Sequence, residues 1–364
     1  MTLVYQLALT RVKGVGNALA KQLIDHCGSA EEVFRSPKKH LTLIPGIGEY
    51  LANNIARYDA MEAIEKEVAF IDKHKIEVLF WTEANYPAKL RSCVDAPVLL
   101  YFKGNANLQA KKVISIVGTR NASAYGKQLC NELVAAFQAE DVLVVSGLAH
   151  GIDSFAHQAC VQRQVPTVGV LGHGLDRIYP SVNRKLAAEM LANGGLLTEY
   201  PSGTSPERQH FPSRNRIIAG LADVTVVVEA NIKGGALITA EIANGYNRDV
   251  CAFPGDINKA SSQGCNHLIK THRAHLISSA KDLAYLMNWE FTVKKKEEQQ
   301  LALKLSLNPV EQRVYDLIKE EGPLGIDSLS YKANLAQSKL AIVLLELEMK
   351  GLLVALPGKI YRIP

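Results

Sequence analysis

Residues 113–118 form the run VISIVG, a short stretch of apolar and β-branched residues that ends in a glycine. Five comparable runs follow along the chain: VLVVSG from Val142, PTVGVLG from Pro166, GLLTEY from Gly195, DVTVVVEA from Asp223 and VCAFPG from Val250. Continuous apolar segments of this length are typical of strands that are buried on both faces. The spacing between the runs leaves room for one helix in each connection. The sequence therefore predicts an α/β fold with a mostly parallel, doubly wound sheet.

The overall composition is that of a globular protein. The chain has 364 residues, of which 48% are hydrophobic and 21% charged, so it is long enough for two or three domains and is neither fibrous nor disordered. The formal net charge of +5 suits a polyanionic partner without requiring one. The first residues lack the features of a secretory signal, and no apolar run approaches the ~18 residues of a membrane helix. We therefore expect a cytoplasmic protein with no membrane partner.

The sheet is expected to occupy residues 63–290, with a helical domain before it over residues 1–62. That domain contains two glycine patterns, VKGVG at 12–16 and IPGIG at 44–48, each followed by a helix-like run. Such glycines permit the turn of a helix-hairpin-helix unit, where main-chain N–H groups meet a DNA phosphate. The alternative is a helical bundle in which the glycines only make tight turns.

A polar linker and a small third domain are expected after the sheet. Residues 294–300 (KKKEEQQ) contain no apolar residue, which predicts a solvated linker over 291–306. Residues 307–364 contain three helix-like runs, followed by two short strands on either side of Pro357-Gly358. Three helices and a hairpin predict a winged helix-turn-helix.

Each predicted strand is followed by a loop with glycines, hydroxyl groups or basic side chains. In parallel sheets, ligands bind outside the carboxyl ends of the strands, and the helix N-termini found there attract anions. The candidate binding residues, in chain order, are Gly118, Thr119, Arg120, Ser146, Gly147, Gly172, Gly174, Arg184, Lys185, Arg208, Phe211, Arg214, Asn215, Arg216, Lys233, Gly234, Gly235 and Thr239. Five such loops exceed what a small nucleotide needs. They predict a polymeric, phosphate-bearing ligand.

The fourth loop is expected to lead into a helix that Ser213 caps and that runs to Leu221. On that helix Arg214 shares a face with Leu221 and its apolar neighbours, whereas Arg216 points away from that face and towards the ligand groove. We therefore predict that Arg214 is a buried organiser of the loop and that Arg216 contacts the ligand.

Phe211 is expected just ahead of this helix, in a polar setting between His210 and Pro212. An exposed ring at that place would offer a stacking platform for an unpaired base, worth about 1–3 kcal/mol per base. The alternative is that the ring packs beneath the loop.

Neither catalysis nor a nucleotide cofactor is indicated. The loops match neither GxGxxG nor GxxxxGK[ST], the patterns of dinucleotide-binding and NTP-binding proteins. Ser146, Asp153 and His157 are hydrolase-type residues, but no GxSxG elbow surrounds the serine. We interpret Asp153 instead as a cap for free N–H groups at the start of a helix. We therefore expect no catalytic residue and no cofactor.

A metal site is not indicated either. The possible ligands Cys265, His267, His272 and His275 have a spacing that matches no familiar site. The six cysteines form no CxxC pair. We expect reduced, mostly buried thiols and no metal.

Five motifs of the central segment carry a family resemblance: GTRNASAYG, SGLAHGID, LGHGLDRIYPSVN, FPSRNRIIAGL and GGALITAEIA. In order and spacing they resemble those of the DNA-processing protein A family, DprA, also called Smf. The resemblance implies an extended Rossmann domain that binds single-stranded DNA as a homodimer, loads the RecA recombinase on it and protects incoming DNA during natural transformation. It also implies an N-terminal helical domain of the SAM or helix-hairpin-helix kind and a C-terminal winged helix. No catalytic residue is established for the family.

The resemblance also assigns individual positions. The family's arginine after its Gly-Ser/Thr pair corresponds to Arg120, and its phenylalanine and Arg-Asn-Arg correspond to Phe211 and residues 214–216. A loop that often contains SGSLxTA has GGALITA at 234–240 here, so the serines are missing. Main-chain N–H groups and Thr239 remain as donors in that loop.

Two other classes of function compete with this one. The first is a nucleotide hydrolase similar to the cytokinin-activating phosphoribohydrolases, although their PGGxGT signature is absent from the sequence. The second is an interaction scaffold in which the winged helix recruits partners. The third helix of that domain has Lys339 near its start but Glu346 and Glu348 near its end, which favours contact with a protein over a DNA major groove.

Overall fold

The computed structural model describes residues 2–138, 140–291 and 307–363. The chain divides into two compact units, Met1–Thr292 and Val293–Pro364. Apart from residue 291, the linker predicted for 291–306 lies outside the described residues. Among the described residues, no helix has the length and apolar character needed to span a membrane.

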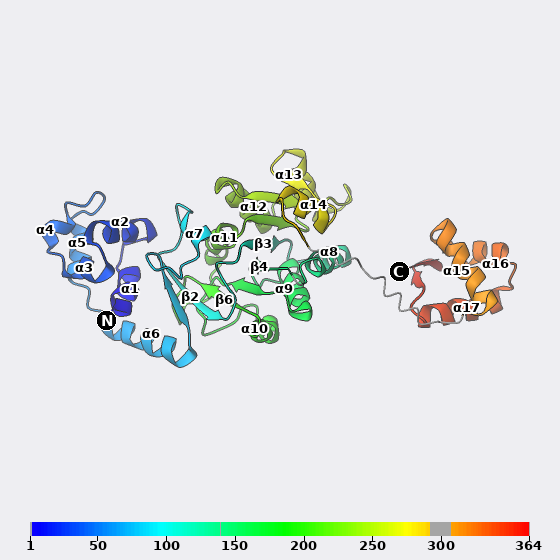
Figure 1. The fold of residues 1–364 in the computed structure, drawn as a ribbon, viewed down its shortest axis with the longest axis horizontal. Coiled ribbons are helices and arrows are strands. Elements are labelled where there is room, and N and C mark those ends of the chain that lie inside the picture. The colour runs from blue at the N-terminus through cyan, green and yellow to red at the C-terminus, as the bar shows by residue number, and fades with distance from the viewer. Residues whose placement is uncertain (1, 139, 292–306, 364) are drawn as a thin grey trace. The chain divides into compact units, whose positions relative to one another are not determined.

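A nine-stranded sheet forms the centre of the first unit (Figure 1). Its strands, in spatial order, are β1 (Glu77–Phe80), β2 (Leu99–Gly104), β6 (Gly194–Thr198), β5 (Thr167–Val170), β4 (Val142–Ser146), β3 (Lys112–Val117), β7 (Val224–Val227), β8 (Asp249–Ala252) and β9 (His275–Leu276). The strands from β6 to β9 pair in parallel, which confirms the predicted doubly wound sheet. β2 is antiparallel to β6, and β1 is antiparallel to β2.

Helices cover both faces of the sheet because alternate side chains of each strand point to opposite sides. Ile114 and Ile116 of β3 pack in one apolar cluster with α8 (Ala124–Ala135) and α9 (Ile152–Arg163). Val113 and Val117 belong to a second cluster with α7 (Ala88–Arg91), α11 (His210–Leu221), α12 (Gly235–Gly245) and α13 (Ala260–Lys270). The other helical segments between residues 88 and 286 are a 3-10 turn (Ser181–Asn183), α10 (Arg184–Met190) and α14 (Ala280–Leu286).

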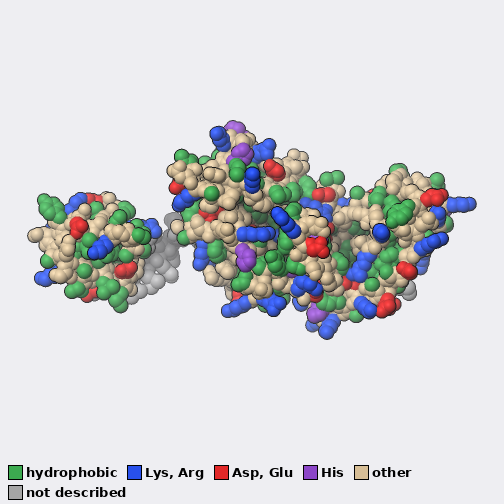
Figure 2. Space-filling view, turned by 180° about the vertical axis from the view of Figure 1, so that it is seen from behind, with side chains coloured by type: hydrophobic (Ala, Val, Ile, Leu, Met, Phe, Trp, Pro, Cys, Tyr) green, Lys and Arg blue, Asp and Glu red, His purple; other side chains and the backbone are tan. Residues whose placement is uncertain are grey.

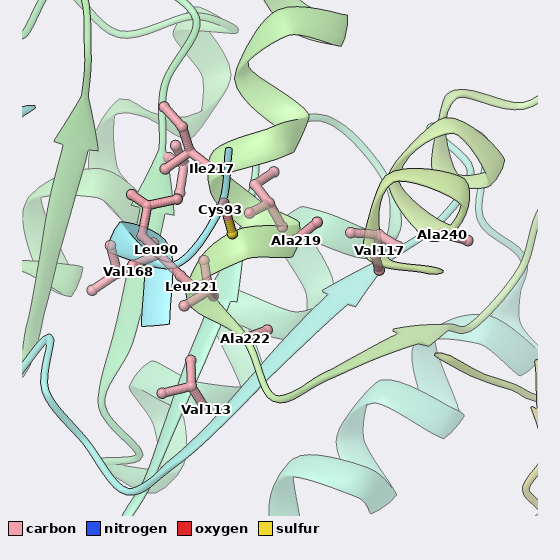
Figure 3. Close-up of a cluster of buried hydrophobic side chains, with 14 of the residues drawn as sticks. Leu90, Cys93, Val113, Val117, Val168, Ile217, Ala219, Leu221, Ala222 and Ala240 are labelled. Carbon is pink, nitrogen blue, oxygen red and sulfur yellow. The ribbon is translucent and has the colours of Figure 1, made fainter. Parts of the chain in front are cut away.

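The second cluster fixes α11 to the sheet (Figure 3). Ile217 and Leu221 lie beside Leu90 of α7, and each of the three side chains is at most 2% exposed. Full burial of such a side chain contributes about 1.5–3 kcal/mol. This packing holds the start of α11 at the carboxyl edge of the sheet.

The N-terminal helices form a small bundle. Their bounds are α1 (Thr2–Arg11), α2 (Asn17–Cys27), α3 (Ala30–Arg35), α4 (Lys38–Leu41), α5 (Glu49–Ala56) and α6 (Met61–His74). The two glycine patterns precede α2 and α5, with Gly14 and Gly46 at φ values of 88° and 80° that favour glycine. The boundary predicted at residue 62 falls inside α6, whose Ile64 shares one apolar core with the earlier helices and with β1 and β2.

The second unit has the architecture predicted for it. Three helices, α15 (Pro309–Glu321), α16 (Ile326–Ala333) and α17 (Gln337–Met349), precede the hairpin of β11 (Val354–Leu356) and β12 (Ile360–Arg362). A two-residue strand, β10 (Leu324–Gly325), completes a three-stranded sheet. Asn308 and Glu311 form a capping box at the start of α15. The unit is a winged helix.

Candidate nucleic-acid interface

A groove of about 560 Å³ opens at the carboxyl ends of β3, β4 and β7. The chain proceeds from β3 through β4 and β5 to β6 on one side, whereas β7, β8 and β9 lie on the other. The groove is therefore at the topological switch point, where open parallel sheets bind ligands. The groove is lined by these of the predicted binding residues: Gly118, Arg120, Arg208, Phe211, Arg214, Asn215, Gly235 and Thr239.

Two aromatic rings and one arginine define the centre of the groove. The guanidinium carbon of Arg120 lies 5.8 Å from the ring centroid of Phe211, and that centroid lies 5.7 Å from the ring of Tyr179. Arg120 is exposed, and Tyr179 keeps 48% of its surface. Sequence reasoning missed Tyr179 as a site residue, although the loop that contains it was singled out.

Phe211 both packs and lines the groove. The Cβ that a residue other than glycine would have at position 172 lies 3.2 Å from the Phe211 ring, so Gly172 provides packing space for the ring rather than an anion contact. The ring is half-buried and its free side faces the groove. The ring therefore packs beneath the loop and keeps one side open to the groove; stacking of a base on that side stays a prediction.

The helix of the fourth loop starts earlier than the sequence analysis expected. α11 begins at His210, so Phe211 lies inside its first turn and Ser213 is not a cap. The Ser213 hydroxyl instead donates to the carbonyl of Gln209 at 3.1 Å. Pro212 is compatible with this start, because a proline is tolerated in the first turn of a helix, where its missing N–H has no intrahelical partner.

Arg214 is the buried organiser that the sequence predicted. It is 4% exposed, and its Nη1 donates to the carbonyl of Gly147 at 2.7 Å and to that of Val170. Burial lowers the pKa of Arg214 to about 10, and the nearby carboxylate of Asp153 opposes that shift. A Cβ at position 147 would lie 2.6 Å from this guanidinium, so Gly147 provides space for it.

The hydrolase-type residues of the second loop are used structurally. The Ser146 hydroxyl is fully buried and donates to the carbonyl of Ile116 at 2.6 Å, so Ser146 is not a ligand contact. His157 is also fully buried, and its Nδ1 lies 2.7 Å from the hydroxyl of Thr167. Burial lowers the pKa of His157 to about 3, which keeps the ring neutral. Asp153 caps the preceding loop, where its Oδ2 accepts from the N–H of Ala149 at 3.3 Å.

The N-terminus of α8, which follows the first loop, is occupied by a carboxylate of the protein itself. Glu229, which follows β7, is 3% exposed and accepts hydrogen bonds from Ser123, the N-cap of α8. Thr119 donates its N–H to the Glu229 carbonyl at 2.7 Å, and it does not line the groove. The expectation that the N-terminus of α8 binds a phosphate is therefore wrong. No local pattern pointed to this contact, because Glu229 is distant along the chain from Ser123.

Several other candidates lie outside the groove. Arg184 and Lys185 are exposed on α10, and Lys185 faces Glu189 at 3.8 Å. Gly174 allows close approach of another segment, since a Cβ there would lie 2.5 Å from the Pro201 carbonyl. Lys233 is exposed beside Gly234, which is the N-cap residue of α12.

Arg216 does not point towards the groove. Its Nη2 contacts the Glu199 carboxylate, and the two side chains are 14% and 13% exposed. Arg216 lies two positions after Arg214, a rotation of about 200° around the helix axis, which turns its side chain to the opposite side of α11. The orientation expected for Arg216 is wrong, although its separation from the buried face of Arg214 was predicted.

The four residues that were considered as possible metal ligands are not gathered. Cys265 is buried in α13, whereas His267, His272 and His275 are exposed. Within residues 2–138, 140–291 and 307–363, no group of three or more His, Cys, Asp or Glu side chains is placed to hold a metal ion.

On the face of the first unit that Figure 2 draws, basic side chains are spread out rather than gathered in one patch. Figure 2 shows Lys and Arg scattered across this face, with Asp and Glu between them. The local arrangement of groups in the groove, rather than the overall charge, distinguishes the site.

Comparison with known proteins identifies the family. Residues 77–288 match the model for DNA recombination-mediator protein A, 298–359 match the DprA winged helix domain, and 7–57 match a SAM-like helix-hairpin-helix tandem. Protein Smf of Synechocystis sp. is 36% identical over 290 residues, which cover 78% of this chain and 72% of that protein.

Solved structures agree with the sequence comparison. DNA processing protein A from Streptococcus pneumoniae has a TM-score of 0.68 at 32% identity, over 79% of this chain and 98% of that one. A Helicobacter pylori DNA processing protein A, described for its single-stranded DNA binding mode, has a TM-score of 0.54 at 27% identity, over 59% of this chain and 98% of that one. This chain therefore belongs to the DNA recombination-mediator protein A (DprA/Smf) family.

Proposed function

We propose that this protein binds single-stranded DNA in the switch-point groove as a recombination mediator. The observation that carries the proposal is the exposed Arg120 guanidinium above the ring of Phe211, with Tyr179 beside it. Aromatic faces stack on unpaired bases of any sequence, and a neighbouring arginine binds phosphate. Arg208 adds a second exposed cation at the rim. The H. pylori relative, described for its binding of single-stranded DNA, supports the same ligand here.

Other parts of the proposal rest on family membership. We infer that the protein acts in the cytoplasm as a homodimer, protects incoming DNA during natural transformation and loads RecA on it. We also infer that it is not an enzyme. Nucleotide hydrolysis is the alternative, but the α8 N-terminus, where a Rossmann-like fold commonly holds a phosphate, is occupied by Glu229.

The domain boundaries and the remaining candidate contacts are part of the proposal. Six candidate contacts do not line the groove: Thr119, Arg184, Lys185, Arg216, Lys233 and Gly234. Any contact between these residues and DNA would come from a strand that extends beyond the groove. A polymeric ligand can extend in this way, whereas a mononucleotide cannot.

The test uses the full chain with fluorescent oligo-dT, competed by unlabelled oligo-dT or by blunt duplex of equal length. We expect oligo-dT to compete more strongly, because stacking needs unpaired bases. Equal competition by the duplex would contradict the proposal. In parallel, release of base from nucleoside monophosphates is assayed, and sustained release would favour the hydrolase alternative. RecA-dependent ATP hydrolysis on single strands, with and without this protein, tests loading.

A further inference from the structure

Glu67 of α6 joins the N-terminal helices to the segment that follows β6. Its carboxylate is buried, with 3% of the residue exposed. Oε2 accepts from Nη2 of Arg11 on α1 at 2.9 Å. The main-chain N–H of Ser202 donates to Oε1 at 3.0 Å, and the Ser202 hydroxyl donates to Oε2 at 2.6 Å. One carboxylate therefore contacts both α1 and the chain beyond the sheet.

The chain from 202 to 209, here called the border segment, leads directly into the groove. Pro206 and Arg208 of this segment line the groove. The loop after β5 holds the border segment on its other side, because Gly203 donates to Asp176 at 3.0 Å and the Thr204 carbonyl accepts from Gly174 at 3.2 Å. Through its hydrogen bonds with Ser202, Glu67 ties this segment to the N-terminal helices.

The contact is difficult to break because it compensates a buried charge. Ser202 supplies two of the three hydrogen bonds that Glu67 receives, and Arg11 supplies the third. If the border segment moved away, a buried carboxylate would lose both donors. Leaving a charged group partly unpaired in the interior costs more than breaking a neutral hydrogen bond at the surface.

We propose that Glu67 is a positioning residue for the DNA groove. By holding Ser202 it determines the path of the border segment and so places Arg208 at the rim. By pairing with Arg11 it makes that path depend on the N-terminal helices. The inference rests on the proposed function of the groove, and it assigns the N-terminal helices an indirect role in binding a single strand.

The test compares Glu67→Leu, Glu67→Gln and Gln6→Leu in the full chain. Glutamine can still accept from the Ser202 N–H through its oxygen and donate from its amide nitrogen to the Ser202 hydroxyl, whereas leucine can do neither. Gln6→Leu is the matched control, because Gln6 is 6% exposed on α1 and donates to Glu83 at 2.7 Å, away from the border segment. For each variant, oligo-dT affinity, the melting temperature and amide hydrogen exchange over residues 203–209 are measured.

We expect Glu67→Leu to weaken oligo-dT binding by about tenfold and to accelerate exchange in the border segment, as is typical of substitutions that act through a coupled network. Glu67→Gln should restore most of the affinity, and Gln6→Leu should lower the melting temperature without changing affinity. Wild-type affinity and exchange in folded Glu67→Leu would overturn this inference alone, as would an equal loss of affinity in Gln6→Leu. Failure of the wild-type chain to bind oligo-dT would instead refute the function of the groove, and with it the role of Glu67.

Discussion

The carboxylate of Glu229 accepts hydrogen bonds from both the main-chain N–H and the hydroxyl of Ser123, at 2.8 and 2.7 Å. It thereby occupies the N-terminus of α8, the place where a sheet of this topology commonly holds a phosphate. The protein retains the fold of a nucleotide-binding domain but fills this phosphate position with its own side chain. The groove beside it is the place where we propose that a longer ligand binds.

Replacement of Glu229 by alanine should destabilise the protein. Ser123 is exposed, so its N–H and hydroxyl could turn to water, but the two hydrogen bonds that they donate to the Glu229 carboxylate would be lost, at about 0.5–1.5 kcal/mol each. Urea unfolding of Glu229→Ala against wild type measures the change in the free energy of unfolding. Glu132→Ala, on the exposed side of α8, is the control and should change it little. An unchanged midpoint in Glu229→Ala would contradict the role assigned to this carboxylate.

Replacement of Arg120 by alanine should weaken binding of every single-stranded sequence alike. Loss of one phosphate contact should also reduce the slope of log affinity against log salt by about 0.7. Fluorescence anisotropy with labelled oligo-dT across a salt series measures both quantities. Arg163→Ala is the charge-matched control, because Arg163 ends α9 and does not line the groove. An unchanged slope in folded Arg120→Ala would mean that Arg120 is structural.

Replacement of Phe211 by leucine separates stacking from packing. Leucine keeps an apolar contact with Gly172 but has no aromatic face, so oligo-dT binding should weaken by about 1–3 kcal/mol with little loss of stability. The control is Phe155→Leu, since Phe155 has a similar cation neighbour in Lys127, at 5.6 Å, but does not line the groove. Equal effects of the two substitutions on affinity would argue against stacking.

Arg214 and Arg216 should behave more alike than the sequence suggested. Arg214→Met removes the donor to Gly147 and leaves Asp153 buried beside no cation, so the melting temperature should fall along with affinity. Arg216→Met leaves Glu199 without its partner and should also lower the melting temperature. The salt slope of oligo-dT binding should change little in Arg216→Met, because its side chain does not line the groove. A shallower slope at normal stability would show direct contact of Arg216 with DNA.

The stability of the protein should depend on pH through His157. The folded pKa of about 3 lies below the usual value of 6.5, so below pH 6.5 the unfolded chain binds a proton that the folded chain does not. The contribution of the neutral His157 ring to the free energy of unfolding is complete above pH 6.5. It is lost as the pH falls towards 3, by up to about 1.4 kcal/mol per pH unit. In His157→Asn the unfolding free energy should fall less steeply between pH 6.5 and 4.5. His267→Asn, an exposed control, should match wild type.

Local pattern was sufficient for the architecture. Each of the six apolar runs from residue 113 to residue 255 became a parallel strand, because a segment buried on both faces must be apolar along its whole length. The three helices and hairpin of the C-terminal unit were predictable for the same local reason, as were Gly14 and Gly46 in their turns. The strands β1 and β2 were missed; both pair antiparallel at one edge of the sheet, outside the regular alternation of parallel strand and helix.

The sequence by itself determined which loops meet at the carboxyl edge of the sheet, and hence that Arg120, Arg208 and Phe211 share one groove. It did not determine which anion-binding positions stay open. Glu229 fills the first one, Glu199 holds Arg216 away from the groove, and Glu67 ties the border segment to α1. These partners are distant along the chain and lie near each other only after the sheet has formed. Helical and strand periodicity describe neighbours within one element, whereas pairing between a buried charge and its partner depends on how separate elements pack.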